Sequence, residues 1–149
     1  MTAFLEVYMW VAFMFIAIIV FLSIPLYILF AVGLFELSKR ENLNTPSLSF
    51  IPFVSFYNLG MVALKDKNLS ITLVVLSLLS LNLSFIDLGY IASLSFIAFT
   101  ILIYYTLYKF YKRVSDDPIV YTLISILTLG FVVPIFVFMF RKRELKKTN

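Results

Sequence analysis

Four long apolar runs constrain the fold of this chain more than any other feature. They lie at roughly 4–37, 69–86, 88–108 and 118–140 of the 149 residues, and no charged residue stands in the interior of any run. A helix needs about 20 residues, rising ~1.5 Å each, to cross ~30 Å of hydrocarbon. The sequence therefore predicts an all-α, polytopic transmembrane bundle with four long helices and one short broken or re-entrant helical segment.

The composition supports a membrane class and removes most enzyme chemistry. Hydrophobic residues make up 62% and charged residues 13% of the chain, whereas soluble domains are about half apolar and a quarter charged. The chain contains no Cys and no His, so thiol nucleophiles, thiolate metal sites and imidazole bases are excluded. We expect one transmembrane domain over 1–149, and no catalytic residue, cofactor or metal site.

Basic residues stand just outside the apolar runs, after the first, third and fourth of them. They are Lys39, Arg40, Lys109, Lys112, Arg113, Arg141, Lys142, Arg143, Lys146 and Lys147. This placement is typical of cations that reach headgroup depth, among the tyrosines that end the third run, with anionic lipid headgroups as partner. A nucleic-acid partner is not expected, because such a partner needs a folded soluble platform.

Counting charges does not decide the orientation. Four spans with an outside N-terminus put seven Lys and Arg residues inside and five outside, and a fifth span at 47–64 gives the same two totals. The basic tail after residue 140 is hard to translocate, and no cation precedes the first run. We therefore expect five segments, with the N-terminus outside and the C-terminus inside.

Two of the runs carry helix-bending residues. The first is too long for a signal peptide, so we expect it to stay in the mature protein as a helix kinked at Pro25. The fourth contains Gly130 and Pro134, which predict a bent helix. Glu36 and Arg40 are four residues apart near the end of the first run, and this spacing predicts an exposed ion pair.

The segment 47–64 is apolar but interrupted by Pro52, Asn58 and Gly60. Ser55 and Asn58 are three residues apart and share one helical face. The segment is long enough to span, to re-enter or to lie in the interface. Irregular backbone at membrane depth requires cover from protein or a water-lined cavity, so any path for a solute is expected here first.

Small residues form two further patterns. Ser77, Ser80 and Ser84 share a face of the second run, and Gly89 and Ser93 have small-xxx-small spacing in the third. Such residues let membrane helices approach closely and share hydrogen bonds. Helix packing is the main interpretation for them, and a polar pore lining is the alternative.

Three aspartates, Asp87, Asp116 and Asp117, are candidates for chemistry. Asp87 reads as a turn or helix N-cap, with an ion-binding role as the alternative. Asp116 and Asp117 precede Pro118, a normal helix start with acidic residues at the positive end of the helix dipole. An enzyme using these carboxylates would lack the His, Cys or helix-spaced second acid that such sites require.

Several stretches resemble a pattern found in small bacterial membrane proteins, in which a "LAKR" helix exit leads to an "IP…N…G" segment. The matching stretches here are 33–40 (GLFELSKR), 49–52 (SFIP), 58–60 (NLG), 107–112 (LYKFYK), 134–138 (PIFVF) and Arg141. The family has a Trp before the Ile-Pro pair, where this chain has Leu48 and Phe50. The resemblance implies a plasma membrane, Gram-positive-like origin and carries no catalytic residue.

Two functions remain. The first is a non-enzymatic integral membrane protein, an accessory, scaffold or immunity-type subunit that contacts its own copies or a larger membrane complex through its helices. Small size and little mass outside the membrane favour it. The alternative is a small channel or transporter whose path is lined by 47–64. Ion paths usually carry ionisable residues inside the membrane, and the interiors of these runs have none.

Overall fold

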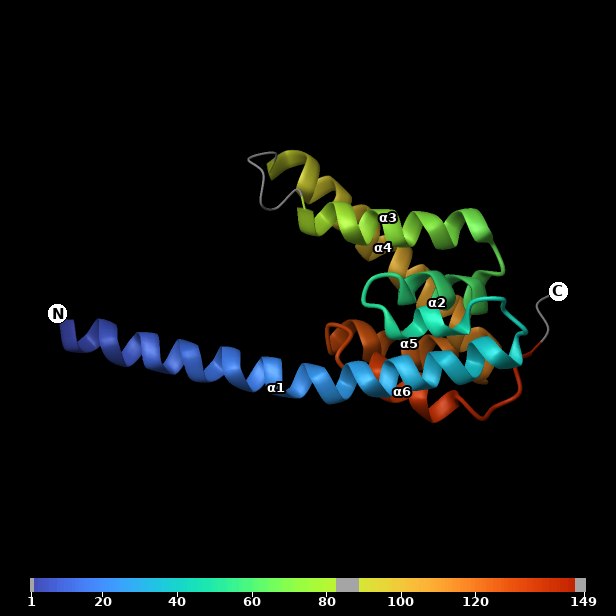
Figure 1. Cartoon of the computed structure of the whole chain (residues 1–149), viewed down its shortest axis with the longest axis horizontal. Helices are drawn as coiled ribbons and strands as arrows, with labels where there is room; N and C mark the ends of the chain where they lie inside the picture. Colours follow the sequence, from blue (N-terminus) through green and yellow to red (C-terminus); the bar gives the residue numbers. More distant parts are fainter. Residues whose placement is uncertain (1, 83–88, 147–149) are drawn as a thin grey trace.

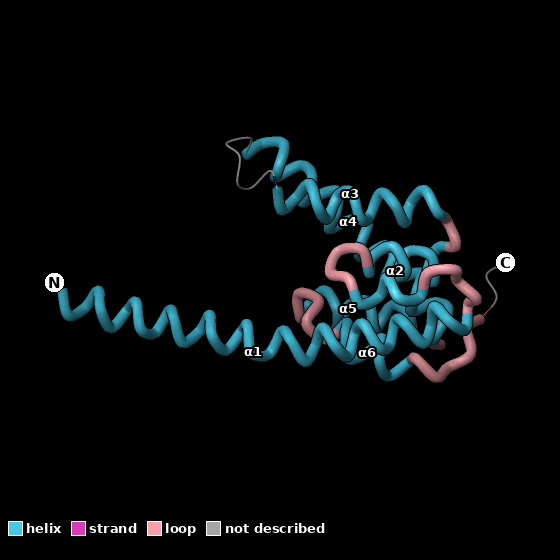
Figure 2. The backbone as a smooth tube through the Cα atoms, viewed as in Figure 1, coloured by secondary structure: helices cyan, strands magenta, loops and turns pink. Residues whose placement is uncertain are grey.

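The structure is a computed structural model and describes residues 2–82 and 89–146. Every regular element in these two ranges is helical (Figures 1 and 2). In chain order they are α1 (Thr2–Arg40), the 3₁₀ helix η1 (Pro46–Phe50), α2 (Ser55–Leu64), α3 (Lys67–Asn82), α4 (Gly89–Val114), α5 (Pro118–Leu127) and α6 (Val133–Phe140). The predicted all-α class is confirmed for the described residues.

Two helices are long and apolar enough to cross a membrane, by length and composition. They are Glu6–Arg40 within α1 and Ser93–Val114 within α4. The helix α3 has 16 residues, and α2 and α5 have 10 residues each. The expected set of four long membrane-spanning helices is therefore not confirmed.

The prediction of one bent helix over 118–140 is wrong. The helix α5 ends at Leu127 and α6 begins at Val133, and the chain reverses between them. Leu129 and Gly130 adopt the left-handed φ values of 51° and 84°, which end a right-handed helix. The N–H of Gly130 donates to the carbonyl of Ser125 at 2.7 Å, closing the end of α5. What the sequence suggested as a bend is a complete change of direction.

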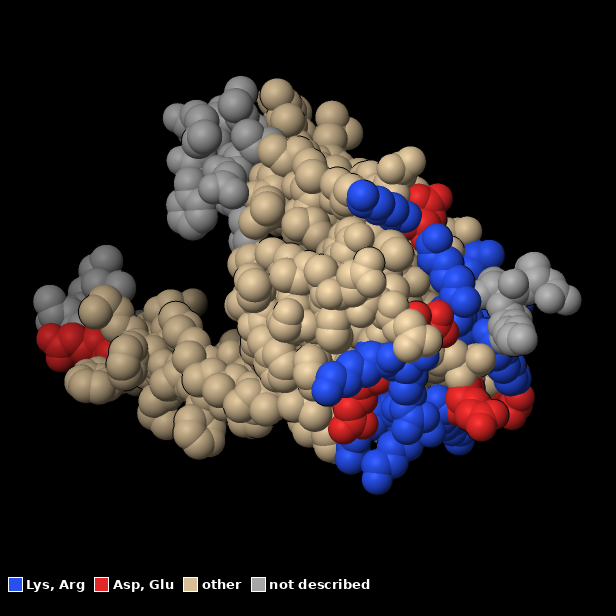
Figure 3. Space-filling model, turned by 45° about the vertical axis from the view of Figure 1, so that its right-hand side comes forward, with Lys and Arg blue, Asp and Glu red and all other residues tan. Residues whose placement is uncertain are grey.

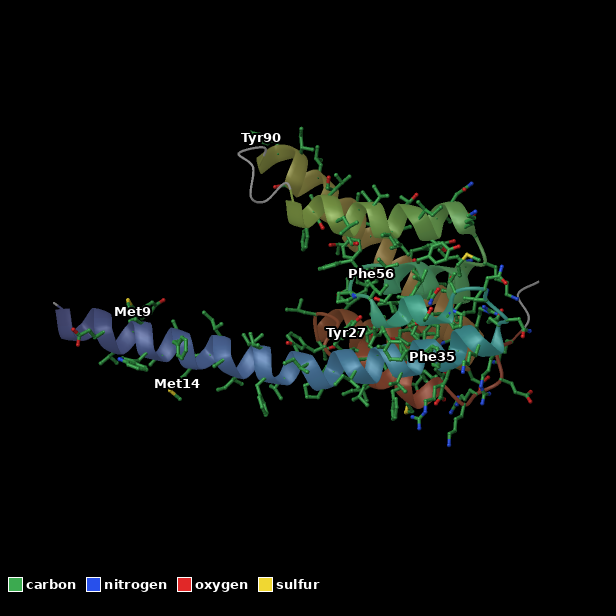
Figure 4. All side chains as sticks on the ribbon, in the orientation of Figure 1. Met9, Met14, Tyr27, Phe35, Phe56 and Tyr90 are labelled. Atoms are coloured by element: carbon green, nitrogen blue, oxygen red, sulfur yellow. The ribbon has the colours of Figure 1, made fainter. Side chains whose placement is uncertain are left out.

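The packed core occupies only one half of the molecule. It forms where the second half of α1, α2, the end of α4 and α6 meet. Its fully buried side chains include Leu34, Leu37, Leu59, Val62, Phe110, Tyr111, Val137 and Phe140. In Figure 4 Phe35 faces the neighbouring elements, whereas Met9 and Met14 stand on a stretch of α1 with nothing beside it. We call residues 6–24, which lie before the first core residue of α1, the outer half of α1.

Two glycines allow helices to approach closely. A Cβ built on Gly33 would lie 2.8 Å from both the Cα and the backbone nitrogen of Phe138, so α1 and α6 touch backbone to backbone. A Cβ on Gly60 would lie 2.9 Å from the Cα of Ser70, and this brings α2 against α3. Separations under 3 Å leave no room for any side chain at these positions.

Replacing Gly33 with Ala should destabilise the protein by about 1–3 kcal/mol, because overpacking against a backbone cannot be relieved by moving a side chain. The substitution would normally gain ~1 kcal/mol in a helix, so a loss identifies the contact with Phe138. Thermal unfolding in detergent measures the effect. Val32→Ala, at the half-buried neighbouring position, serves as the control, and a Gly33→Ala variant more stable than the parent would contradict the contact.

Candidate functional site

Charged residues gather at one end of the molecule, opposite the N-terminus of α1 (Figure 3). We call this region the charged end. It collects four stretches of sequence: the end of α1, the α2–α3 turn, the α4–α5 junction and the segment after α6. These stretches, with the last turns of α4, carry Lys39, Arg40, Lys65, Lys67, Lys109, Lys112, Arg113, Arg141, Lys142, Arg143 and Lys146.

Arg113 connects these stretches. Its Nη2 forms an ion pair with Oε1 of Glu41, its Nη1 donates to the carbonyl of Val62, and its Nε donates to the carbonyl of Lys146 at 3.3 Å. The second carboxylate oxygen of Glu41 lies 3.2 Å from the Nζ of Lys65. A planar guanidinium presents its donors in fixed directions and can hold several acceptors at once.

We expected Arg113 to reach lipid headgroups like the other cations at the end of the third run, but its side chain is enclosed by the chain itself and is only 3% exposed. Burying a charge is costly unless it is paired and hydrogen-bonded, and here a carboxylate and two backbone carbonyls provide that compensation. The backbone N–H of Lys146 also donates to the carbonyl of Arg113 at 2.9 Å. The C-terminal segment is therefore tied to α4 in both directions.

Glu36 does not pair with Arg40 as the spacing predicted. Its carboxylate lies 3.3 Å from the Nε of Arg141, just after α6. Arg40 instead donates from Nη1 to the carbonyl of Lys142 at 2.9 Å. Both residues turn to the chain beyond α6 because α6 packs along the second half of α1 and ends beside the same turn.

Asp116 is an exposed ion-pair residue in the structure. Its carboxylate lies 2.5 Å from the Nζ of Lys146, and this hydrogen bond lowers the pKa of Asp116. The stabilisation is present above the ordinary carboxyl pKa and fades as the pH falls through the lowered one. Asp117 stands at the N-cap of α5 without a side-chain cap bond, and its N–H donates to Ser115 Oγ at 3.1 Å. Asp87 lies outside the described residues.

Asn58 is fully buried, and its side-chain amide links η1 to α2. The Nδ2 atom lies 2.9 Å from the carbonyl oxygen of Thr45, 3.2 Å from that of Pro46 and 2.9 Å from Ser49 Oγ. The amide donor thus binds three acceptors of the chain itself. Its Oδ1 is buried with no hydrogen-bond partner in the described part of the chain. A solute using this amide would have to displace η1.

The other candidates in 47–64 take separate places. Pro52 is exposed in the turn before α2, whereas Ser55 and Gly60 are buried on α2. Gly60 meets Ser70 of α3, and Asn58 faces η1, so the two lie in different contacts. The structure does not bring these four residues together around one cavity.

The serine stripe is only partly within the described residues. Ser77 is buried and Ser80 half-buried, and each hydroxyl donates to the carbonyl three residues earlier, at 2.7 and 2.9 Å. Ser84 lies outside the described residues. Gly89 is the first residue of α4, and Ser93 is exposed on that helix. Their roles in packing or path lining stay predictions.

Tyr111 joins α4 to α5, a contact that the sequence did not reveal. Its hydroxyl lies 2.8 Å from Ser125 Oγ, and both side chains are fully buried. We expected Tyr111 at headgroup depth with the other tyrosines of α4. Its ring instead packs against Tyr121, with centroids 5.7 Å apart, and against Phe136 at 6.0 Å. Nothing in the local pattern distinguishes it from its exposed neighbour Tyr105.

A pocket of ≈ 280 Å³ opens beside the linker between α1 and η1. It is lined by Asn42, Leu43, Asn44, Thr45, Tyr57 and Met61. Within the described ranges, no three His, Cys, Asp or Glu side chains are placed to share a metal ion. No family model, curated protein or solved structure matches the chain. A functional proposal for this chain therefore rests on the geometry of the structure alone.

Replacing Arg113 with Met should lower the free energy of unfolding by about 3–5 kcal/mol, because Glu41, the buried carbonyl of Val62 and the carbonyl of Lys146 lose their donor. Arg113→Lys should also destabilise, since a single ammonium cannot replace the guanidinium fork. Chemical unfolding in detergent gives the values, with exposed Lys112→Met as the control, expected within ~0.5 kcal/mol of the parent. Equal effects of Arg113→Met and Lys112→Met would contradict the stabilising role of the bonds that Arg113 makes to Glu41, Val62 and Lys146.

Replacing Asn58 with Leu should destabilise the protein by about 1–3 kcal/mol, because buried acceptors around η1 lose their donor. Hydrogen exchange should then speed up over 45–50 before the rest of the chain opens. Leu59→Met, a neighbouring core change of similar volume, is the control. If solute flux in proteoliposomes fell with Asn58→Leu while stability and exchange stayed unchanged, the result would favour a path-lining role of Asn58 over its structural link between η1 and α2.

Proposed function

We propose that the chain is a multi-pass integral protein of the plasma membrane that acts as a non-enzymatic accessory or scaffold subunit. Its partners would be transmembrane helices of its own copies or of a larger complex. One observation carries this proposal: the outer half of α1 is apolar apart from Glu6 and Ser23, its large side chains are exposed on every face, and no other described element lies beside it (Figure 1). A helix of this kind needs either lipid or a partner around it.

The exposure of the outer half of α1 argues for lipid as its surroundings. Phe13, Phe15 and Phe21 are 65, 65 and 76% exposed, on different faces of the helix. In water such a surface is unfavourable by ~25 cal/mol for each Å² of apolar area, and in hydrocarbon this cost disappears. A helix that is apolar all round is typical of a membrane span. Tyr8 and Trp10 near its outer end suit the interfacial aromatic belt.

The length of α1 fits the same setting. Its 39 residues, at ~1.5 Å each, extend about 58 Å, well beyond a hydrocarbon thickness of ~30 Å. Such a helix tilts in the membrane or projects beyond it. Lys39 and Arg40 at its inner end and the aromatic residues near its outer end are suitable anchors.

The distribution of internal contacts supports a role as a subunit. At the charged end, Glu36 and Glu41 pair with cations of the chain itself, and the core fills the half of the molecule next to this end. The outer half of α1 is left with its large aromatic side chains protruding. Association of helices in lipid depends on side-chain packing, and protruding rings fit a partner helix that presents small residues. The outer half of α1 is therefore the place where we expect a partner helix.

Replacing exposed outer-half residues 13–22 with Leu keeps the hydropathy of the span and removes its specific shape. The variant should remain in carbonate-washed membranes and keep its thermal stability, because no core residue changes. In mild detergent it should lose its stoichiometric partner or its fixed oligomeric state, as measured by light scattering of the purified complex.

The matched control places Leu at exposed positions of α4, where Ile91, Phe96, Ile97 and Ile101 are 51, 60, 54 and 67% exposed. This change should leave the size of the complex unaltered. The proposal is overturned if the parent protein is a monomer without a partner in every mild detergent, or if the outer-half variant assembles like the parent.

A further inference from the structure

We infer that two parts of the chain enter only half of the membrane, so that the exposed cations among the described residues face a single, cytoplasmic layer of anionic lipid headgroups. The two half-membrane units are η1 with α2 (46–64) and α5 with α6 (118–140). Only α1, α3 and α4 then cross. This inference rests on the proposed membrane location and goes beyond it by assigning the topology and the lipid-binding face.

The first unit returns to the end of the molecule from which it starts. Glu41, before η1, and Val62, in the last turn of α2, both bind the guanidinium of Arg113. Lys65, just after α2, pairs with the same Glu41. The helix α2 has 10 residues and extends about 15 Å, half of a ~30 Å hydrocarbon layer. The unit is thus too short to reach the far side and need not do so.

The second unit also begins and ends at the charged end. The carbonyl of Val114, before α5, accepts a hydrogen bond from Arg143 Nη1 at 3.3 Å, and Asp116 pairs with Lys146. The helices α5 and α6 have 10 and 8 residues, about 15 and 12 Å. In Figure 2 the loop between them lies well short of the α1 N-terminus.

The tip of the second unit is suited to hydrocarbon. Leu129 and Phe131 are 82 and 56% exposed and apolar, so the outward-facing side chains there need no water. Four N–H groups of the tip, those of Leu129, Gly130, Phe131 and Val133, each donate to a carbonyl between residues 125 and 130. A loop at membrane depth survives only when its backbone groups are satisfied in this way.

The three remaining helices supply the crossings. The helix α4 has 26 residues, about 39 Å, and ends at the charged end beside Arg113. The helix α3 starts there at Lys67 and packs along α4. Its 16 residues extend about 24 Å, less than a full ~30 Å span, and lead toward the opposite side. With α1 this makes three crossings, which put the two ends of the described chain on opposite sides.

This topology removes the ambiguity of the charge count. Of the 12 Lys and Arg residues, Lys147 lies outside the described residues. The remaining 11 stand at the end of α1, near the α2–α3 turn, in the last turns of α4 or after α6, which are the stretches that the ion pairs and hydrogen bonds bring to the charged end. Five full spans would have divided the 12 Lys and Arg residues of the full sequence seven to five between the two sides of the membrane. Cations concentrate on the cytoplasmic side, where anionic headgroups attract them. Glu6 lies at the opposite extremity of α1.

Single-cysteine labelling tests the topology directly, because the chain has no native Cys. Full-length variants would carry one thiol each, at Glu6, Asn44, Lys67, Asp117, Leu129 or Lys142. A membrane-impermeant maleimide should label Glu6→Cys in intact cells. The Asn44, Lys67, Asp117 and Lys142 variants should be labelled only after the membrane is opened, and Leu129→Cys should resist labelling until detergent is added.

Different outcomes separate this inference from the proposed membrane location. Labelling of Asp117→Cys and Lys142→Cys from opposite sides, or of Leu129→Cys from the outside, would overturn the half-membrane units. A fully inverted pattern would overturn the cytoplasmic assignment. Removal of the parent protein from membranes by carbonate would instead contradict membrane integration itself. Purified parent protein should also bind phosphatidylglycerol from mixed micelles in preference to phosphatidylcholine, and equal binding of both lipids would overturn the anionic-headgroup assignment.

Discussion

The buried guanidinium of Arg113 is the interaction on which the arrangement at the charged end depends. Its three bonded partners come from the linker after α1, the last turn of α2 and the C-terminal segment. Because a buried cation is tolerated only when its donors are matched, these stretches cannot move apart independently. The core lies next to this network, and the ends of α1, α2, α4 and α6 converge on it. Electrostatic satisfaction and apolar packing therefore stabilise the same half of the molecule.

Close approach of helix backbones also stabilises that half of the molecule. Gly33 lets α6 lie directly on the backbone of α1, and Gly60 does the same for α2 and α3. Short helices bury few side chains each, so close approach increases the contact that each residue makes. The outer half of α1 lacks such neighbours and exposes its aromatic rings. The molecule thus divides into a self-sufficient inner half and an outer helix that depends on its surroundings.

The sequence predicted the helical class, because long apolar runs without charges have few other solutions. It did not predict the reversal at 128–132, since Gly130 and Pro134 are equally compatible with a bend, and Leu129 gives no sign of its positive φ. The sequence around Arg113, rich in Tyr and Lys, did not indicate that Arg113 is buried. Its partners Glu41 and Val62 are 72 and 51 residues away in the chain, so local patterns could not show the contacts. Asn58 was identified as a site candidate on its isolated polarity, and its actual partners in η1 required the three-dimensional arrangement.

The separation of charge along the molecule has a consequence for biosynthesis. On translocon-insertion scales, an ionised side chain that is left at the middle of a membrane helix costs about 2.5–3.5 kcal/mol. Among the residues that the structure describes, Glu6 is the one such group found at the distal extremity. The apolar tip of the α5–α6 unit can be delivered from the side of synthesis without exporting any ion. The described part of the chain can therefore be inserted with little dehydration of charged groups.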